Sequence, residues 1–95
     1  MRLVWTRRYL RELDAIGDYI AERNPRAAVK VVRAIHQTTA RLLSDNPHLG
    51  RSGEIEGTRE LVISGLPYIV AYRVTELQVE ILFVQHAARE WPDEA

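Results

Sequence analysis

The sequence contains no cysteine among its 95 residues. This absence excludes a disulfide framework, a thiolate metal site and a cysteine nucleophile. No apolar run approaches the length that a membrane-spanning helix requires, and no signal-peptide pattern opens the chain. We therefore expect a cytoplasmic protein that has no membrane partner.

Lysine is also scarce, and the chain has no excess of positive charge. Only Lys30 is a lysine among the 13 basic residues, and 13 acidic residues balance them to a formal net charge of zero. Proteins that mainly grip a nucleic-acid backbone usually have a basic excess, so this balance argues against that class. Arginine does suit bidentate contacts with carboxylate or phosphate groups.

The pattern that is present predicts a short strand followed by two helices. Residues 2–5 are predicted to form an edge strand, and Thr6 is a suitable N-cap for the first helix. Asn24 and Pro25 end that helix and begin a second one, whose apolar stripe covers residues 28–43. Because almost no loop joins the helices, they are expected to form an antiparallel hairpin. The apolar stripe of the first helix consists of Leu10, Leu13, Ile16 and Ile20.

Three apolar, β-rich runs follow a predicted loop at residues 48–57. The predicted strands are Thr58–Ile63, Tyr68–Val74 and Val79–Gln85. Their short links require an antiparallel meander. The order β-α-α-β-β-β predicts an α+β fold in a single domain over residues 1–95, with an antiparallel sheet and the N-terminal helical hairpin packed on one face. The opposite sheet face has nothing to cover it and is expected to be open.

Side chains alternate between the two faces of a strand, so the pairing register decides which residues lie together. We expect Ile63 to pair with Tyr68 and Val74 to pair with Val79. The face expected to pack on the helices then carries Arg59, Leu61, Ile63, Tyr68, Val70, Tyr72, Val79, Ile81 and Phe83. The open face carries Glu60, Val62, Ile69, Ala71, Arg73, Glu80, Leu82, Val84 and His86.

Two polar residues in the predicted sheet each allow two interpretations. Arg73 could hold a phosphate or a partner's carboxylate, but an ion pair with Glu80 or Glu60 is favoured from the residues alone. His86 could act as a general acid or base because its ordinary pKa lies near neutrality. A hydrogen-bonded histidine at the end of a strand is the favoured interpretation of His86.

The remaining histidines, His36 and His48, are expected to be solvated. None of the three histidines has the spacing of a metal site, so no metal is predicted. No glycine-rich phosphate cradle joins a strand to a helix, so no cofactor is predicted either.

Several motifs, taken in order, resemble the RelE/ParE superfamily of type II toxin–antitoxin toxins. The resemblance covers essentially the whole chain, including the helical hairpin. The motifs that carry it are Asn46-Pro47-His48-Leu49-Gly50-Arg51, Gly57-Thr58-Arg59-Glu60-Leu61, Pro67-Tyr68, Tyr72-Arg73-Val74, Val79-Glu80-Ile81-Leu82 and His86-Ala87-Ala88-Arg89-Glu90-Trp91-Pro92.

This resemblance implies a small toxin that an antitoxin encoded beside it neutralises in a hetero-oligomer. The antitoxin would be ParD-like, with a ribbon-helix-helix N-terminal domain and a toxin-binding tail. RelE-like members cut mRNA on the ribosome, and ParE-like members inhibit DNA gyrase. If the chain is RelE-like, the resemblance implies that Arg59 and Arg73 hold the phosphate and that His86 is the catalytic acid–base residue. The implied residues that contact the antitoxin or the target are Arg8, Arg11, Arg73, Arg89 and Trp91.

The ending His-Ala-Ala-Arg-Glu-Trp-Pro is similar to ParE-like sequences, no tyrosine follows His86, and the net charge is zero. We therefore expect a ParE-like inhibitor of DNA gyrase that is not an enzyme. One alternative is a RelE-like, ribosome-dependent and metal-independent mRNA endonuclease. Another is a plasmid-stabilisation relic that only binds its antitoxin.

Overall fold

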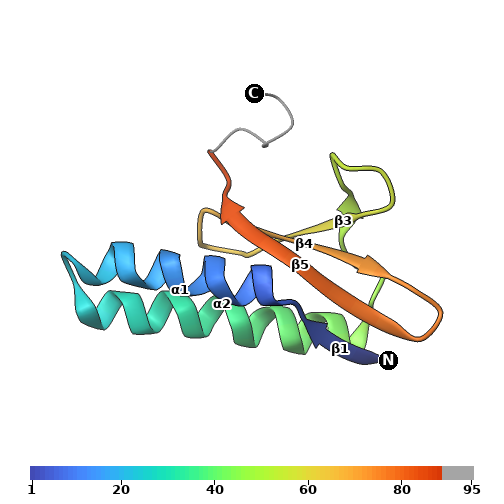
Figure 1. Ribbon diagram of the computed structural model, residues 1–95, viewed down its shortest axis with the longest axis horizontal. Coiled ribbons are helices and arrows are strands. Elements are labelled where there is room, and N and C mark those ends of the chain that lie inside the picture. Colours follow the sequence, from blue (N-terminus) through green and yellow to red (C-terminus); the bar gives the residue numbers. More distant parts are fainter. Residues whose placement is uncertain (89–95) are drawn as a thin grey trace.

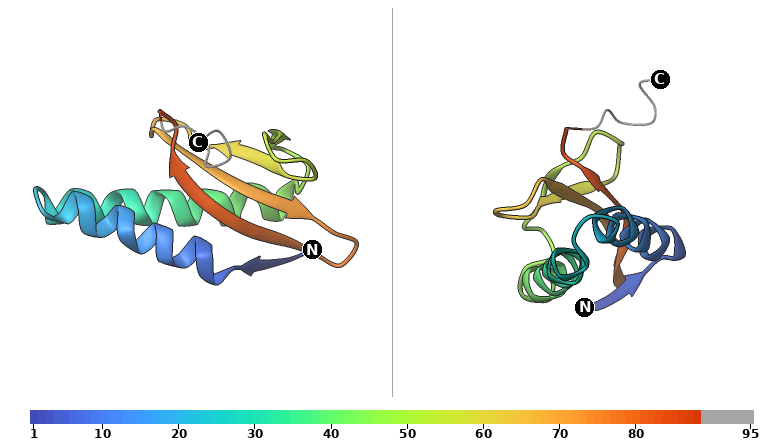
Figure 2. Two further views of the ribbon diagram at one scale, coloured as in Figure 1. Left: turned by 45° about the horizontal axis from the view of Figure 1, so that its top comes forward. Right: turned by 90° about the vertical axis from the view of Figure 1, so that its left-hand side faces the viewer.

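The computed structural model describes residues 1–88 as two helices and five strands. A helical hairpin lies along one face of a twisted sheet, and the turn that joins the helices projects beyond the sheet (Figures 1 and 2). This arrangement confirms the α+β order and the predicted hairpin. The elements are β1 (Arg2–Trp5), α1 (Arg7–Ala21), α2 (Pro25–Asp45), β2 (Arg51–Ser52), β3 (Arg59–Val62), β4 (Tyr68–Val74) and β5 (Gln78–His86).

Local capping signals explain where the helices begin. The Thr6 hydroxyl accepts a hydrogen bond from the backbone N–H of Tyr9 at 3.2 Å. The Asn24 side chain accepts one from Ala27 N–H at 3.1 Å, and Pro25 occupies the first turn of α2. Each cap satisfies a backbone donor that the first helical turn would otherwise leave unpaired. Both predicted helix starts are therefore confirmed.

The sheet has the strand order β1-β5-β4-β3-β2. The meander of β3, β4 and β5 is antiparallel as predicted, but the edge strand β1 runs parallel to β5, so the sheet is mixed. The segment predicted as a loop at residues 48–57 contains the short strand β2, which pairs with β3. The ends of β3 and β5 differ from the prediction by one residue at each terminus.

A β-bulge at Leu82 changes which side chains share a sheet face. Tyr72 pairs with Ile81 and Ala71 pairs with Phe83, so Leu82 has no partner on β4. Beyond this extra residue, every side chain of β5 changes face. The predicted pairings Val74–Val79 and Ile63–Tyr68 are correct.

Because of the bulge, Val84 and His86 lie opposite Val70 and Tyr68, on the face that packs on the helices. The prediction that placed Val84 and His86 on the same face as Arg73 was therefore wrong. Phe83 changes face in the opposite direction and lies with Ala71.

The core lies between the hairpin and the sheet, and its position on α1 differs from the predicted stripe. Tyr9 is fully buried, whereas Leu10 is 43% exposed. Tyr9 and Leu13 are four residues apart, so both lie on the side of α1 that contacts α2 and β5. The predicted stripe on α2 is largely correct, since Ala28, Ile35, Thr39 and Leu43 are buried.

The sheet face predicted to be open is closed at its centre. Ile69, Ala71 and Phe83 are each at most 7% exposed. Long charged side chains explain part of this burial, because the Arg8 guanidinium lies 4.3 Å from the centre of the Phe83 ring. Val62, 49% exposed, is an apolar residue of this face that stays open. The prediction of an uncovered face was therefore wrong.

Candidate functional site

Arg59 holds the segment that follows α2. Its guanidinium donates hydrogen bonds to the carbonyl oxygens of Gly50 at 2.8 Å and His48 at 3.3 Å. The Tyr72 hydroxyl, opposite Arg59 in the register, accepts a hydrogen bond from Gly50 N–H at 2.7 Å. Burial raises the pKa of the Tyr72 hydroxyl, so this group stays protonated. The Arg59 side chain is thus engaged within the fold.

Arg73 makes the ion pair that the sequence favours. Its guanidinium donates to one Glu80 oxygen at 2.6 Å, and the Gln78 side chain donates to the other oxygen at 2.8 Å. The hydrogen bond from Arg73 is the main reason that the pKa of Glu80 lies below its ordinary value. The second partner considered for Arg73, Glu60, instead pairs with Arg51 at 3.0 Å.

His86 lies at the other end of β5. Its ring packs edge-on against Tyr68 with the centroids 5.4 Å apart, and its Nδ1 accepts a hydrogen bond from Ala88 N–H at 3.1 Å. The side chain is exposed. Burial raises the pKa of the Tyr68 hydroxyl, so the ring that supports His86 is neutral.

The structure does not bring Arg59, Arg73 and His86 together. Arg73 pairs with Glu80, and His86 is six positions after Glu80 along β5, which corresponds to about 20 Å at 3.3 Å per residue. Arg59 and Arg73 lie at neighbouring register positions of the sheet but on opposite faces. A general acid or base acts within about 3 Å of the proton that it moves, which is far shorter than the separation between Glu80 and His86 along β5.

Arg8 and Arg11 lie on the first turns of α1. Arg8 forms an ion pair with Glu12 at 3.0 Å, while the other Glu12 oxygen accepts a hydrogen bond from Val84 N–H at 3.1 Å. Arg11 is exposed. The other two candidates for partner binding, Arg89 and Trp91, lie outside the described residues.

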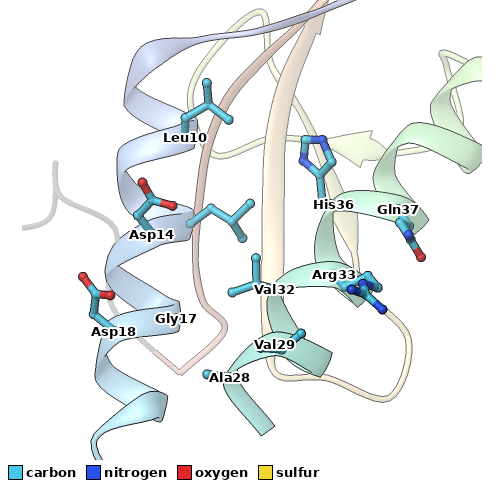
Figure 3. Close-up of a pocket in the computed structure, with 11 residues that line it drawn as sticks. Leu10, Asp14, Gly17, Asp18, Ala28, Val29, Val32, Arg33, His36 and Gln37 are labelled. Atoms are coloured by element: carbon cyan, nitrogen blue, oxygen red, sulfur yellow. The ribbon is translucent and has the colours of Figure 1, made fainter. Parts of the chain in front are cut away.

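A groove with an apolar lining lies between α1 and α2. Its volume is about 560 Å³. Figure 3 shows residues of α1 on one side and residues of α2 on the other. The lining residues are Leu10, Leu13, Asp14, Gly17, Asp18, Ala28, Val29, Val32, Arg33, His36 and Gln37.

Small side chains let the two helices approach closely at the floor of this groove. A Cβ atom at Gly17 would lie 3.0 Å from Cγ2 of Val32, so a glycine at this position allows the contact. Ala28, which lines the same groove, is buried. Above the floor, Leu10 is 43% exposed and Val29 is 56% exposed, which leaves apolar surface in contact with water.

His36 lines one end of the groove and packs against two aromatic side chains, Trp5 and Tyr9. The Trp5 ring lies 4.0 Å from the His36 ring between centroids, and the Tyr9 hydroxyl lies 3.1 Å from His36 Nδ1. Burial lowers the pKa of His36 and raises that of Tyr9, so both groups are neutral near pH 7. The Tyr9 hydroxyl then donates to Nδ1, and the second ring nitrogen of His36 carries the proton.

His36 was therefore assigned wrongly as a simple solvated residue. Sequence reasoning missed this cluster and the groove, because 27 residues separate Tyr9 from His36 and no local pattern joins them. The sequence did contain one signal for the groove. Tyr9 and Leu10 are adjacent apolar residues, and a single face of a helix can bury only one of them.

No group of three or more histidine, aspartate or glutamate residues within residues 1–88 lies close enough to hold a metal ion. None of the helices in this range combines the length and hydropathy that crossing a membrane requires. The groove offers a partner an apolar floor, exposed apolar side chains and charged edges.

Comparison with known proteins gives a consistent result. The family model described as ParE toxin of type II toxin-antitoxin system, parDE, matches residues 3–91. Y4kP of Sinorhizobium fredii, which is named as a candidate toxin, is 48% identical over 91 residues, covering 96% of this chain and 93% of that protein. Toxin RelE2 of Caulobacter vibrioides is 39% identical over 88 residues, covering 93% of this chain and 97% of that protein.

A solved structure described as the chromosomal ParDE TA system from P. aeruginosa has the same fold. Its TM-score with this chain is 0.83 at 32% sequence identity, and the match covers 90% of this chain and 95% of that chain.

Proposed function

Because the chain belongs to the ParE toxin family of type II toxin–antitoxin systems, we propose that it inhibits DNA gyrase by direct contact and performs no chemistry of its own. The observation that carries this proposal is the separation of Arg59, Arg73 and His86. A ribonuclease that moves protons at one phosphate needs such groups around one centre. The proposed place of action is the cytoplasm, where gyrase works.

Each of these three polar residues also has a partner within the fold. Arg59 binds the carbonyl oxygens of His48 and Gly50, Arg73 binds Glu80, and His86 packs on Tyr68. A phosphate would have to compete with these contacts. A net charge of zero adds no general attraction for RNA. Inhibition by contact needs neither a catalytic group nor a basic surface.

An mRNA endonuclease is the alternative function, and the similarity to a protein named toxin RelE2 favours it. In that case His86 is the acid–base residue, and the arginines stabilise charge on the phosphate. The third possibility, a relic that only binds its antitoxin, predicts no effect on either target.

We place the antitoxin contact in the α1–α2 groove. Leu10 and Val29 expose apolar surface there, and Asp14, Asp18 and Arg33 form none of the ion pairs found within residues 1–88. An amphipathic helix is the element that fits such a groove, because its apolar face covers the floor while its polar edges meet the charged rims. The apolar centre of the opposite sheet face is already buried, which makes it a poorer docking site.

Two assays on the purified chain test the proposed target. We expect ATP-dependent supercoiling by purified gyrase to fall as the chain is added, while reporter mRNA in a translation extract stays intact. The double variant Arg73→Gln, His86→Gln should inhibit gyrase as well as the parent chain does. If mRNA is cut at ribosome-occupied codons and this variant stops the cutting, the endonuclease function replaces the gyrase function. If neither assay responds, only antitoxin binding remains.

A further inference from the structure

The two rims of the α1–α2 groove carry opposite charges. Figure 3 shows Asp14 and Asp18 on the α1 side and Arg33 with Gln37 on the α2 side. All four are exposed, so an occupant of the groove can reach them. None of the four takes part in an ion pair with another residue of the range 1–88, where the ion pairs are Arg8–Glu12, Arg51–Glu60 and Arg73–Glu80.

The groove also differs between its two ends. Leu10 and His36 lie at the end next to β1, where the Trp5 ring packs at a tilt against the His36 ring. Gly17 and Ala28 lie toward the turn that joins the helices. Trp5 and Tyr9 pack against His36 at the first end, whereas the small residue Gly17 lets the two helices approach closely at the second. Asp18 is eight positions after Leu10, so the lined part is about 12 Å long, which is slightly more than two helical turns.

These asymmetries constrain how a helix can lie in the groove. A helix that rests its apolar face on the floor presents one edge to each rim. To reverse its direction while its apolar face stays on the floor, the helix must turn by 180° about an axis normal to the groove. Each edge of the helix then faces the opposite rim. A helix whose edges carry opposite charges therefore meets complementary rims in one direction and like charges in the other.

We propose that Asp14, Asp18 and Arg33 fix the direction of the antitoxin helix in the groove. The edge of the helix along α1 is basic, and the edge along α2 is acidic. This inference rests on the proposed antitoxin site, because it takes the groove as the place where that helix binds.

A pair of designed peptides tests the direction. Each peptide has about 14 residues, enough for four turns, with a leucine-rich face and a lactam bridge on the exposed face to hold the helix. One peptide carries lysine along one edge of its apolar face and glutamate along the other edge. The second peptide has the same composition, but its lysines and glutamates are exchanged between the two edges. A nitroxide at the N-terminus broadens nearby amide signals of the ¹⁵N-labelled full-length chain.

We expect the two peptides to bind with similar affinity and in opposite directions. One label should broaden signals near Leu10 and His36, and the other should broaden signals near Gly17 and Ala28. The variant Asp14→Lys, Asp18→Lys, Arg33→Glu exchanges the rims and should exchange these results. A peptide with glutamine on both edges should bind about tenfold more weakly, as expected for three lost exposed charge pairs, and broaden both ends equally.

Other outcomes separate this inference from the proposed antitoxin site. If Val29→Glu abolishes peptide binding but both labels broaden the same end, the groove is the site and the rims do not set the direction. The inference also fails if the rim-exchange variant leaves the broadened ends unchanged. If Val29→Glu leaves the binding of both peptides and of the antitoxin unchanged, the groove is not the site, and both the site and the inference fail.

Discussion

The α1–α2 groove and the sheet both contain charged residues, but they differ in whether those residues have partners within the fold. In the groove, Asp14 and Arg33 are exposed, and neither pairs with another of residues 1–88. On the sheet, Arg73 pairs with Glu80, and Arg59 binds backbone carbonyl oxygens. Arg59 and Arg73 thus form contacts within the fold. The surface available to a partner lies in the groove, where apolar side chains are exposed and charged side chains have no ion-pair partner among residues 1–88.

From this difference, we expect the largest effect when Val29→Glu is tested for antitoxin binding. Val29 is 56% exposed in the groove, so the free chain should unfold at an unchanged denaturant concentration. In the complex, the glutamate would be buried against an apolar helix face, and we expect the antitoxin dissociation constant to rise about 100-fold. Titration calorimetry with the cognate antitoxin measures this change.

Val62→Glu is the matched control for this substitution. Val62 is 49% exposed, but it lies on the sheet face away from the hairpin. We expect its effect on antitoxin binding to be negligible. If Val62→Glu weakens binding as strongly as Val29→Glu, the contrast between groove and sheet is wrong.

The second prediction concerns the buried contacts of the sheet. Tyr72→Phe removes the hydroxyl that accepts a hydrogen bond from Gly50 N–H at 2.7 Å. The buried N–H is then left without this acceptor, so the free energy of unfolding should fall by about 1–3 kcal/mol. Urea denaturation measures the loss, and Tyr19→Phe, at a residue 72% exposed, should cost almost nothing. Equal losses in the two variants would show that the Tyr72 hydroxyl has no special structural role.

The element order and helix caps could be predicted because each depends on neighbouring residues. Thr6 and Asn24 cap the helices through contacts within three residues. The bulge at Leu82 could not be predicted in this way. The Thr6 hydroxyl donates to the carbonyl oxygens of Ile81 and Leu82, and Glu12 accepts from Val84 N–H, so residues more than 70 positions away hold the backbone there.

The candidate site was harder to predict from the sequence for the same reason. The groove exists only once α1 and α2 pack together, and that packing selects Tyr9 rather than Leu10 for the core. Motif resemblance directed attention to Arg59, Arg73 and His86 because they lie in recognisable segments. It carried no information on the register that separates them.

His36 gives a smaller effect that depends on pH. Burial lowers the pKa of His36 in the folded chain below its ordinary value of 6.5. The unfolded chain therefore binds more protons between these two values, and stability should rise with pH through this window and level off above about 6.5. His36→Gln should flatten this slope in urea denaturations between pH 5 and pH 8, a range around the ordinary histidine pKa of about 6.5. A slope that persists unchanged in His36→Gln would show that His36 is not its source.

The smallest effect is expected for Arg73→Gln. The pair with Glu80 is exposed, so solvent screens the attraction and the urea midpoint should shift no more than it does for Arg11→Gln on α1. The pKa of the Glu80 carboxyl is lowered mainly by Arg73, so the wild-type pair stabilises the fold above the ordinary pKa of Glu80 and loses this contribution as pH falls. In Arg73→Gln, the pKa of Glu80 should rise toward its ordinary value, which NMR titration of the side chain measures. A loss of stability as large as that of Tyr72→Phe would mean that Arg73 belongs to the buried framework of the sheet, and the contrast with the groove would then have to be redrawn.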